Sequence, residues 1–136
     1  MLRKMMRGKI HHATITQCDP DYVGSITIDA DLLRASDIMP NEAVLVLDVD
    51  NAARFETYVI RGQSGSGIIG INGPASKLTA VGHRVIVIAF GQIDDTLPHA
   101  LDEHEAKVVI ADGQNRVGKL LRIPSTLDPV RTVSTR

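Results

Sequence analysis

The sequence has almost no cysteine and no long apolar run, and these absences exclude several classes of protein. Its single thiol, Cys18, cannot form an intramolecular disulfide, so nothing indicates an oxidising compartment. No segment approaches the ~18 apolar residues of a membrane span. The basic start, MLRKMMRGKIHH, lacks the apolar run of roughly 7–15 residues that a signal peptide needs. We therefore expect a cytoplasmic protein with no membrane partner.

An excess of charge of one sign is also missing. Among 136 residues, 15 Lys and Arg face 16 Asp and Glu, which leaves a net charge of -1. Proteins that neutralise phosphates usually carry a basic excess, so we expect no nucleic-acid partner. The five histidines form no H-E-x-x-H or Cys/His pattern, so no metal is expected. We also expect His11 and His12 to point to opposite faces of a strand.

The sequence does contain many short segments rich in Val, Ile and Thr, which predict strands. Some are continuously apolar, as in strands covered on both faces, and this favours a closed, mainly β barrel. Two short helices are expected at Asp31–Ser36 and Pro74–Leu78. The predicted strands are Ile10–Thr16, Ser25–Asp29, Ala43–Val49, Phe55–Ile60, Gly67–Ile71 and Arg84–Phe90.

The chain changes character at about Gln92. Within residues 1–92, LLRASDIMPNEAVLV and SKLTAVGHRVIVI form a faint repeat, which reflects either two related halves of one barrel domain or coincidence. Residues 93–136 are typical of a C-terminal tail of low order, disordered at its end. Within this tail, KVVIADGQNRVGKLLRIP could form a hairpin around Asp112-Gly113 or one weak strand.

The dipeptide Gly24-Ser25 is an ordinary turn sequence, but it permits an unusual reaction. A serine hydroxyl can attack the carbonyl before it and convert the amide to an ester. Elimination then leaves a dehydroalanine that hydrolyses to a pyruvoyl group. We expect an unusual φ/ψ at Gly24, which would leave this carbonyl uncrowded. A pyruvoyl carbonyl can form a Schiff base with an amine substrate and act as an electron sink, as pyridoxal phosphate does.

Such a site needs four further parts. They are a cation for the substrate carboxylates, an acid to reprotonate the carbanion, small polar groups for positioning, and backbone N–H donors near the developing charge. The sequence has candidates for each part, although each candidate alone also fits a surface, core or turn position. The candidates are Arg54 and Lys9 for the carboxylates, Tyr58 as the acid, Thr57 and Asn72 for positioning, and Gly73–Ala75 for the backbone donors.

Five stretches occur in order across residues 1 to about 90: MLRKMMRGKIHHATIT, DYVGSITID, NAARFETYVI, GSG and ING. Together they closely resemble the bacterial aspartate α-decarboxylase family. These pyruvoyl enzymes convert L-aspartate to β-alanine and CO2 for pantothenate and coenzyme A biosynthesis. The resemblance implies a six-stranded double-psi β-barrel with short helices, assembled as a homotetramer with active sites between neighbouring subunits.

The resemblance also implies how this chain matures and which residues act. In the family the Gly-Ser bond is cleaved autocatalytically, which here would give a β chain of residues 1–24 and an α chain of residues 25–136. The covalent pyruvoyl group derived from Ser25 then replaces PLP, no metal is needed, and some members require a maturation factor. The implied roles are Ser25 as the pyruvoyl that forms the Schiff base, Tyr58 as proton donor, Gly24 and Thr57 in processing, and Lys9, His11, Tyr22, Arg54, Thr57, Asn72, Gly73, Pro74 and Ala75 around the substrate.

Other interpretations stay open. The segment SITIDADLLRASDIMPNEAVLVLDV also resembles the strand–helix–strand unit of swapped-hairpin DNA-binding regulators, but no arginine cluster accompanies Arg34. An unprocessed, non-catalytic member of the same family is a second alternative, although no named site residue is lost. The glycine-rich stretch Gly62–Gly73 lacks the G-K-[ST] of a phosphate loop and fits a turn better. Pro74 replaces the small residue usual at its position and has no N–H to donate.

Overall fold

The computed structural model describes residues 1–129 and 133–135, and it confirms a mainly β protein with short helices. The strands are β1 (Leu2–Thr14), β2 (Gln17–Asp19), β3 (Ser25–Asp29), β4 (Ala43–Asp48), β5 (Arg54–Gly62), β6 (Ile69–Asn72), β7 (Arg84–Asp94), β8 (Glu105–Ala111), β9 (Val117–Pro124) and β10 (Val133–Thr135). The helices are α1 (Ala30–Ser36), the 3-10 helix η1 (Gly73–Leu78) and α2 (Ala100–Glu103). No helix in the described part is long and apolar enough to cross a membrane.

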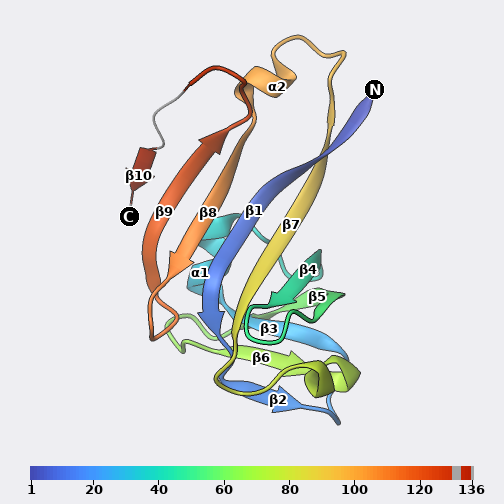
Figure 1. Ribbon diagram of the computed structural model, residues 1–136, viewed down its shortest axis with the longest axis vertical. Helices are drawn as coiled ribbons and strands as arrows, with labels where there is room; N and C mark the ends of the chain where they lie inside the picture. Colours follow the sequence, from blue (N-terminus) through green and yellow to red (C-terminus); the bar gives the residue numbers. More distant parts are fainter. Residues whose placement is uncertain (130–132, 136) are drawn as a thin grey trace.

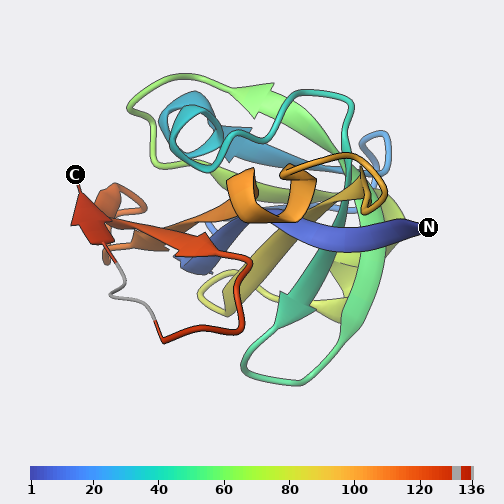
Figure 2. The same ribbon diagram turned by 90° about the horizontal axis from the view of Figure 1, so that it is seen from above.

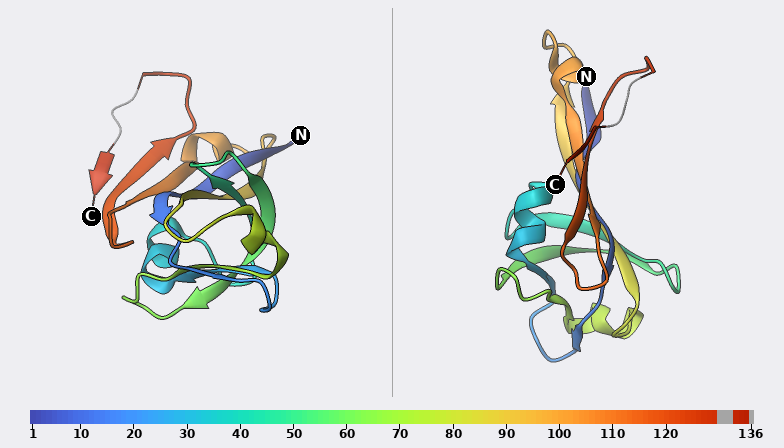
Figure 3. Two further views of the ribbon diagram at one scale, coloured as in Figure 1. Left: turned by 60° about the horizontal axis from the view of Figure 1, so that its bottom comes forward. Right: turned by 90° about the vertical axis from the view of Figure 1, so that its left-hand side faces the viewer.

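Hydrogen bonds join the strands into one mixed sheet in the order β10-β9-β8-β1-β7-β4-β5-β3-β6-β2. β1 pairs antiparallel with β7 and parallel with β8, whereas β3 pairs parallel with β5 and antiparallel with β6. Figure 1 and Figure 3 show β1, β7, β8 and β9 extending beyond a more compact body. No ladder joins the end strands β10 and β2 within residues 1–129 and 133–135, so the sheet is open. Closure into a six-stranded double-psi barrel therefore stays a prediction.

Branched aliphatic side chains form the core. The strands curve around this interior (Figure 2). In β4, Val44 and Val46 are buried, whereas Leu45 and Leu47 are only half-buried. This period of two is what a strand with one face on the core requires. The largest fully buried side chains are Ile10, Ile15, Ile26, Ile28, Leu32, Ile38, Ile69, Ile71, Val44, Val46, Val59 and Val85.

A buried carboxylate, Asp29, joins the end of β3 to the start of α1 and to the loop before β6. Its Oδ1 accepts the N–H groups of Asp31 (2.8 Å) and Gly65 (3.1 Å), and its Oδ2 accepts the N–H of Gly67 (2.8 Å). The first of these bonds caps the N-terminus of α1. The helix ends at Ser36, and its C-cap residue Asp37 has a left-handed φ of 59°. One side chain therefore fixes three backbone segments.

The region after residue 92 differs from the expected low-order tail. β7 continues to Asp94, and β8 and β9 form the hairpin that was one of two expected alternatives, with Glu105 opposite Pro124 and Ala111 opposite Val117. β8 adds to the edge of β1, and Val109 is fully buried there. The expectation of low order is wrong for this hairpin because it covers a strand edge that would otherwise be open. Residues 130–132 and 136 of the expected disordered end lie outside the described residues.

Gly8 provides a test of the packing between β1 and α1. A Cβ at Gly8 would overlap the backbone oxygen of Ser36 at the end of α1. We expect Gly8→Ala to lower the free energy of unfolding by roughly 1–3 kcal/mol, because backbone cannot yield as a flexible side chain can. Urea unfolding measures this, with Gly113→Ala as the matched control, since a Cβ at Gly113 meets nothing within 4 Å. Equal stability of the two variants would contradict this packing.

Candidate active site around Ser25

Ser25 begins β3, and its side chain is held in place by two hydrogen bonds. The residue is 1% exposed. Its hydroxyl donates to the carbonyl oxygen of Val23 (2.8 Å) and accepts from Asn72 Nδ2 (2.9 Å). The bond to Val23 folds the hydroxyl back across the Gly24–Ser25 peptide. The Ser25 hydroxyl, which the sequence predicts to be the nucleophile, is therefore buried and directed back toward residue 23.

Asn72 reaches Ser25 from the neighbouring strand. The antiparallel ladder of β3 and β6 places Ser25 directly opposite Asn72. The Asn72 amide also donates to Thr27 Oγ1 (3.0 Å), so two hydroxyls fix its orientation. Thr27 was missed by sequence reasoning. The signal that could have found it is its position two residues after Ser25, which puts both side chains on one face of the strand.

A close backbone contact lies on the other side of the Gly24–Ser25 bond. Gly73 has a left-handed φ of 75°, and a Cβ there would lie 2.6 Å from the Gly24 Cα. Pro74 Cδ is the nearest atom to a Cβ built on Gly24, at 3.9 Å. Gly73 therefore has the left-handed conformation that glycine permits. Gly24, for which the sequence predicts an unusual φ/ψ, is not among the residues with positive φ. Proline fits at position 74 because the first turn of a helix needs no N–H from it.

Tyr58 and Thr57 lie on β5, the parallel neighbour of β3. Ile26 pairs with Val59. Tyr58 and Ser25 each precede these residues by one position, so they lie at the same level of the two strands. Both Tyr58 and Thr57 are half-buried. Because side chains alternate along a strand, Tyr58 shares the face of Ser25 and Thr57 takes the other. Tyr58 therefore lies on the strand next to Ser25 and on the same face of the sheet.

Tyr22 and Ala75 flank the same region. Tyr22 precedes Gly24 by two residues, and its side chain is exposed. Its carbonyl oxygen would lie 3.3 Å from a Cβ at Gly73. Ala75 packs against the hydrophobic core from η1. The Tyr22 backbone therefore lies close to Gly73, whereas Ala75 contacts the core.

The other expected residues, Lys9, His11 and Arg54, do not lie next to Ser25 in the strand pairing of a single chain. β7, β4 and β5 separate β1, which carries Lys9 and His11, from β3. Arg54 precedes Tyr58 by four residues, or roughly 13 Å along an extended strand. Within the part of the chain that the structure describes, neither Lys9 nor Arg54 makes an ion pair. Both charges are therefore available to another molecule.

Lys9 and Arg54 instead flank one surface, which we call the outer aliphatic face (Leu45, Leu47, Ile86 and Ile88). The ladders align Lys9 with Ile88, Ile88 with Leu45, and Leu47 with both Ile86 and Arg54. These positions alternate with buried valines, so they point away from the core. All four aliphatic side chains are half-buried. One chain thus presents a continuous apolar surface with cations at its two edges.

His11 lies at a bulge of β1. The register shifts between Ile10 and Ala13, His12 has a φ of 60°, and the rings of His11 and His12 stack 3.8 Å apart at 15°. The expectation that these histidines point to opposite faces is wrong, because the extra residue of a bulge breaks the alternation. Burial lowers the pKa of His11, and the positive charges of His12, Lys9 and Arg84 lower it further. This favours neutral His11 beside several cations.

One group in the described residues could hold a metal. Ligand atoms of Asp48, Asp50 and His83 lie within 4.8 Å of one another. Asp48 Oδ1 accepts the N–H groups of Asp50 (2.8 Å) and Asn51 (3.1 Å), and Asp48 Oδ2 lies 2.7 Å from His83 Nδ1. Asp50 Oδ2 accepts the N–H of Arg84 (2.8 Å). These bonds fix the turn between β4 and β5, and they account for the cluster without a metal.

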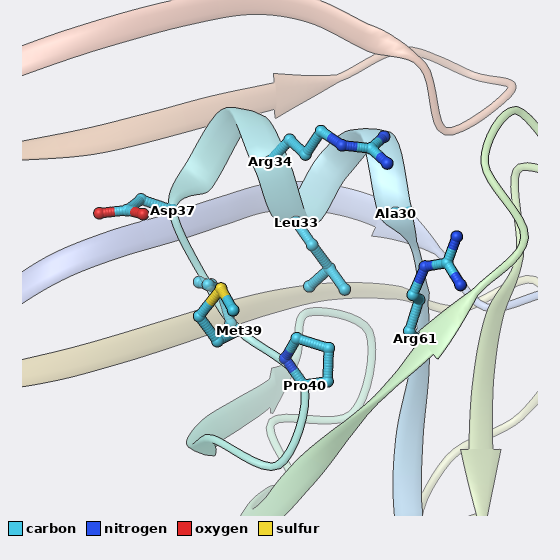
Figure 4. A pocket seen from close by; sticks show the side chains of 8 residues that line it. Ala30, Leu33, Arg34, Asp37, Met39, Pro40 and Arg61 are labelled. Carbon is cyan, nitrogen blue, oxygen red and sulfur yellow. The ribbon is translucent and has the colours of Figure 1, made fainter.

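A pocket of about 400 Å³ lies beside α1, and it contains none of the residues around Ser25. Figure 4 shows Leu33, Met39 and Pro40 lining it, with the guanidinium groups of Arg34 and Arg61 on the same side. Its lining is mostly apolar. It is therefore a separate feature from the candidate site.

The family model of aspartate decarboxylase matches residues 1–118 of the 136 residues of this chain. The match covers every residue described around Ser25, together with the outer aliphatic face. It also covers β8 and the turn that follows it, so most of the region first expected to be an appended tail falls within the family.

The environment of His11 can be tested by titration. We expect the NMR titration midpoint of His11 to lie below the ordinary value of 6.5, chiefly because burial disfavours the charged ring. Since the unfolded chain binds this proton at higher pH, the contribution of His11 to stability should be present above pH 6.5 and be lost as the pH falls through its folded pKa. Lys9→Gln should raise the midpoint by removing one positive charge. A midpoint at or above 6.5 would contradict the described surroundings.

Proposed function

Because the chain belongs to the aspartate decarboxylase family, we propose that it cleaves its own Gly24–Ser25 bond and uses the resulting pyruvoyl group to convert L-aspartate to β-alanine and CO2. The observation that carries this proposal is the buried Ser25 hydroxyl, held by Asn72 and folded back across the bond to be cut. A cytoplasmic role in supplying β-alanine for pantothenate and coenzyme A follows from the same proposal.

In the proposed cleavage the Ser25 hydroxyl is the attacking group, and its hydrogen bond from Asn72 supports this role. Ser25 Oγ attacks the Gly24 carbonyl carbon, the C–N bond breaks, and an ester forms with Ser25 nitrogen as a free amine. Elimination releases Gly24 as a carboxylate and leaves a carbon–carbon double bond at residue 25. Water then adds and ammonia leaves, so the net reaction consumes one water. Asn72 keeps the oxygen in place for the first step, and fixed geometry of this kind removes much of an entropic barrier.

The two fragments should remain one folded unit after cleavage. β1 lies between β7 and β8, and β2 pairs with β6, so residues 1–24 keep three ladders of hydrogen bonds to the larger fragment. Ile10, Ala13 and Ile15 of the smaller fragment are buried in the common core. The fragments therefore separate only when the protein is denatured.

The residues around Ser25 suit a small dicarboxylic amino acid. The pyruvoyl group supplies an electrophilic carbonyl that takes up the substrate amine and draws electrons from the bond to the departing carboxylate. Tyr58, level with position 25, would return a proton to the carbon that loses CO2. The cations Arg54 and Lys9 would bind carboxylates, Arg54 through its planar fork.

A complete site requires a second copy of the chain. Arg54, Lys9 and His11 lie around the outer aliphatic face, not beside Ser25 of the same chain. An apolar surface of this kind is typical of a subunit contact. We therefore place the neighbour's cations against Ser25 in a homotetramer of double-psi β-barrels, as the family resemblance implies.

The alternatives are less well supported. A swapped-hairpin DNA-binding role would need a basic surface, and the net charge is -1. An uncleaved, non-catalytic family member requires that the Gly24–Ser25 bond persists. A maturation factor would change the rate at which the bond is cut, not the residues that react.

The decisive variants are Ser25→Ala and Tyr58→Phe. Ser25→Ala should show a single full-length band on a denaturing gel and release no CO2 from aspartate, because no hydroxyl remains to attack. Tyr58→Phe is the matched control, since it keeps Ser25 and Asn72. It should be cleaved, with kcat lower by roughly 100-fold or more if its hydroxyl is the proton donor.

Each outcome has a contrary result. Cleavage of Ser25→Ala would exclude the proposed nucleophile. Full turnover by Tyr58→Phe would remove Tyr58 from the reaction while leaving self-cleavage intact. Wild-type protein that stays intact under all conditions and releases no CO2 would favour the non-catalytic alternative.

A further inference from the structure

The turn between β8 and β9 reaches a part of the molecule far from it in sequence. Asn115 in this turn is 2% exposed and has a left-handed φ of 59°. Figure 1 shows the turn near the C-terminal end of β1 and the loop that leads into β6. A Cβ on Gly67 of that loop would lie 2.8 Å from the carbonyl oxygen of Gln114, so the two segments are in backbone contact.

Asn115 uses its whole amide to join these segments. Its Oδ1 accepts the N–H of Thr14 (2.7 Å). Its Nδ2 donates to the carbonyl oxygens of Thr14 (2.8 Å) and Gly67 (2.8 Å). One acceptor and two donors are thus satisfied, which is unusual for a simple turn residue and typical of a buried polar link. Asn115 therefore fixes the end of β1 to the loop before β6.

Further hydrogen bonds connect this link to the start of β6. Thr16, two residues after β1, donates its N–H to the carbonyl oxygen of Ile69 (2.8 Å), and its Oγ1 accepts the N–H of Ile69 (3.0 Å). Ile69 begins β6, and Asn72 ends it. β6 is therefore held at its first residue, Ile69, by the segment that follows β1. Asn115 joins the end of β1 to the loop before β6, and Asn72 at the other end of β6 binds the Ser25 hydroxyl.

Arg116 forms a second arm of the same turn. Its guanidinium donates to the carbonyl oxygen of Gly65 and lies 3.8 Å from Asp29 Oδ2. Asp29 ends β3, the strand that Ser25 begins, and Asp29 also accepts the N–H groups of Gly65 and Gly67. The β8–β9 turn thus holds one end of the β3–β6 ribbon, and Ser25 with Asn72 lies at the other end.

We propose that Asn115 is a positioning residue for self-cleavage at Ser25, because it sets the register of β6 against β3. A slip of one residue would turn the Asn72 amide to the opposite face and remove it from the Ser25 hydroxyl. The inference rests on the proposed self-cleavage. The register of β6 against β3 matters most before cleavage, while Ser25 is still bonded to Gly24. The effect of Asn115 therefore falls on the rate of cleavage more than on turnover by chains already cut.

Asn115→Gly removes the three hydrogen bonds while keeping a residue that accepts a positive φ. We expect its precursor to be cleaved at least ~10-fold more slowly than wild type, since small misplacements of reacting groups cost large factors in rate. The loss in kcat per cleaved chain should be smaller than the loss in cleavage rate. Denaturing gels of freshly purified precursor give the first quantity, and CO2 release normalised to the amount of fragment 1–24 gives the second.

Two controls separate positioning from general destabilisation. Asn41→Gly changes another left-handed asparagine (φ 72°) that is exposed, and it should be cleaved at the wild-type rate. Val46→Ala makes a cavity in the core and should lower the melting temperature without a comparable loss in cleavage rate. If Asn115→Gly fails to fold, Arg116→Ala at a half-exposed position decides the matter, with slower cleavage expected there too.

The outcomes distinguish this inference from the proposed function. Wild-type protein that is never cleaved contradicts the proposed function itself. Wild type that is cleaved, with Asn115→Gly cleaved equally fast, overturns the positioning role alone. The inference is also overturned if Asn115→Gly lowers the cleavage rate and the kcat per cleaved chain by equal factors, and if Val46→Ala at the same melting temperature shows the same losses. That result would show that Asn115 has a merely structural role.

Discussion

The hydrogen bond between the Asn72 amide and the Ser25 hydroxyl is the constraint on which the proposed chemistry depends. Such a bond contributes only about 1 kcal/mol to stability, so its importance lies in placement. The Asn72 amide holds the buried Ser25 hydroxyl from one side. The bond that this hydroxyl donates to the Val23 carbonyl also restrains its rotation about the Cα–Cβ bond. A serine at an ordinary turn lacks both restraints.

The placement is secured from both ends of the β3–β6 ribbon. At one end Gly73 packs directly on Gly24, at a distance that admits no side chain on Gly73. At the other end the Asp29 carboxylate and the Asn115 amide bind the backbone of the 63–67 loop. The second end uses buried polar side chains whose partners are backbone atoms, and a satisfied network of this kind favours one register.

Local patterns in the sequence predict much of the fold but not its long-range links. The period of two in β4 and the proline of η1 correctly indicate strand and helix. The neighbourhood of Gly24, Ser25, Asn72 and Gly73 follows from family resemblance, since nothing local relates residues 25 and 72. The β8–β9 hairpin is one of two alternatives that the sequence leaves open, but its order could not be predicted, because it depends on a contact that spans 101 residues, from Asn115 to Thr14. The stacking of His11 on His12 depends on a bulge, which the composition of the strand does not reveal.

The exact mass of the larger fragment after denaturation tests the central claim most directly. A fragment 25–136 that begins with a pyruvoyl group is lighter, by one molecule of ammonia, than the same sequence beginning with serine. The account predicts this lighter mass together with an unmodified fragment 1–24. An intact chain of 136 residues, or a fragment that keeps an N-terminal serine, would contradict it.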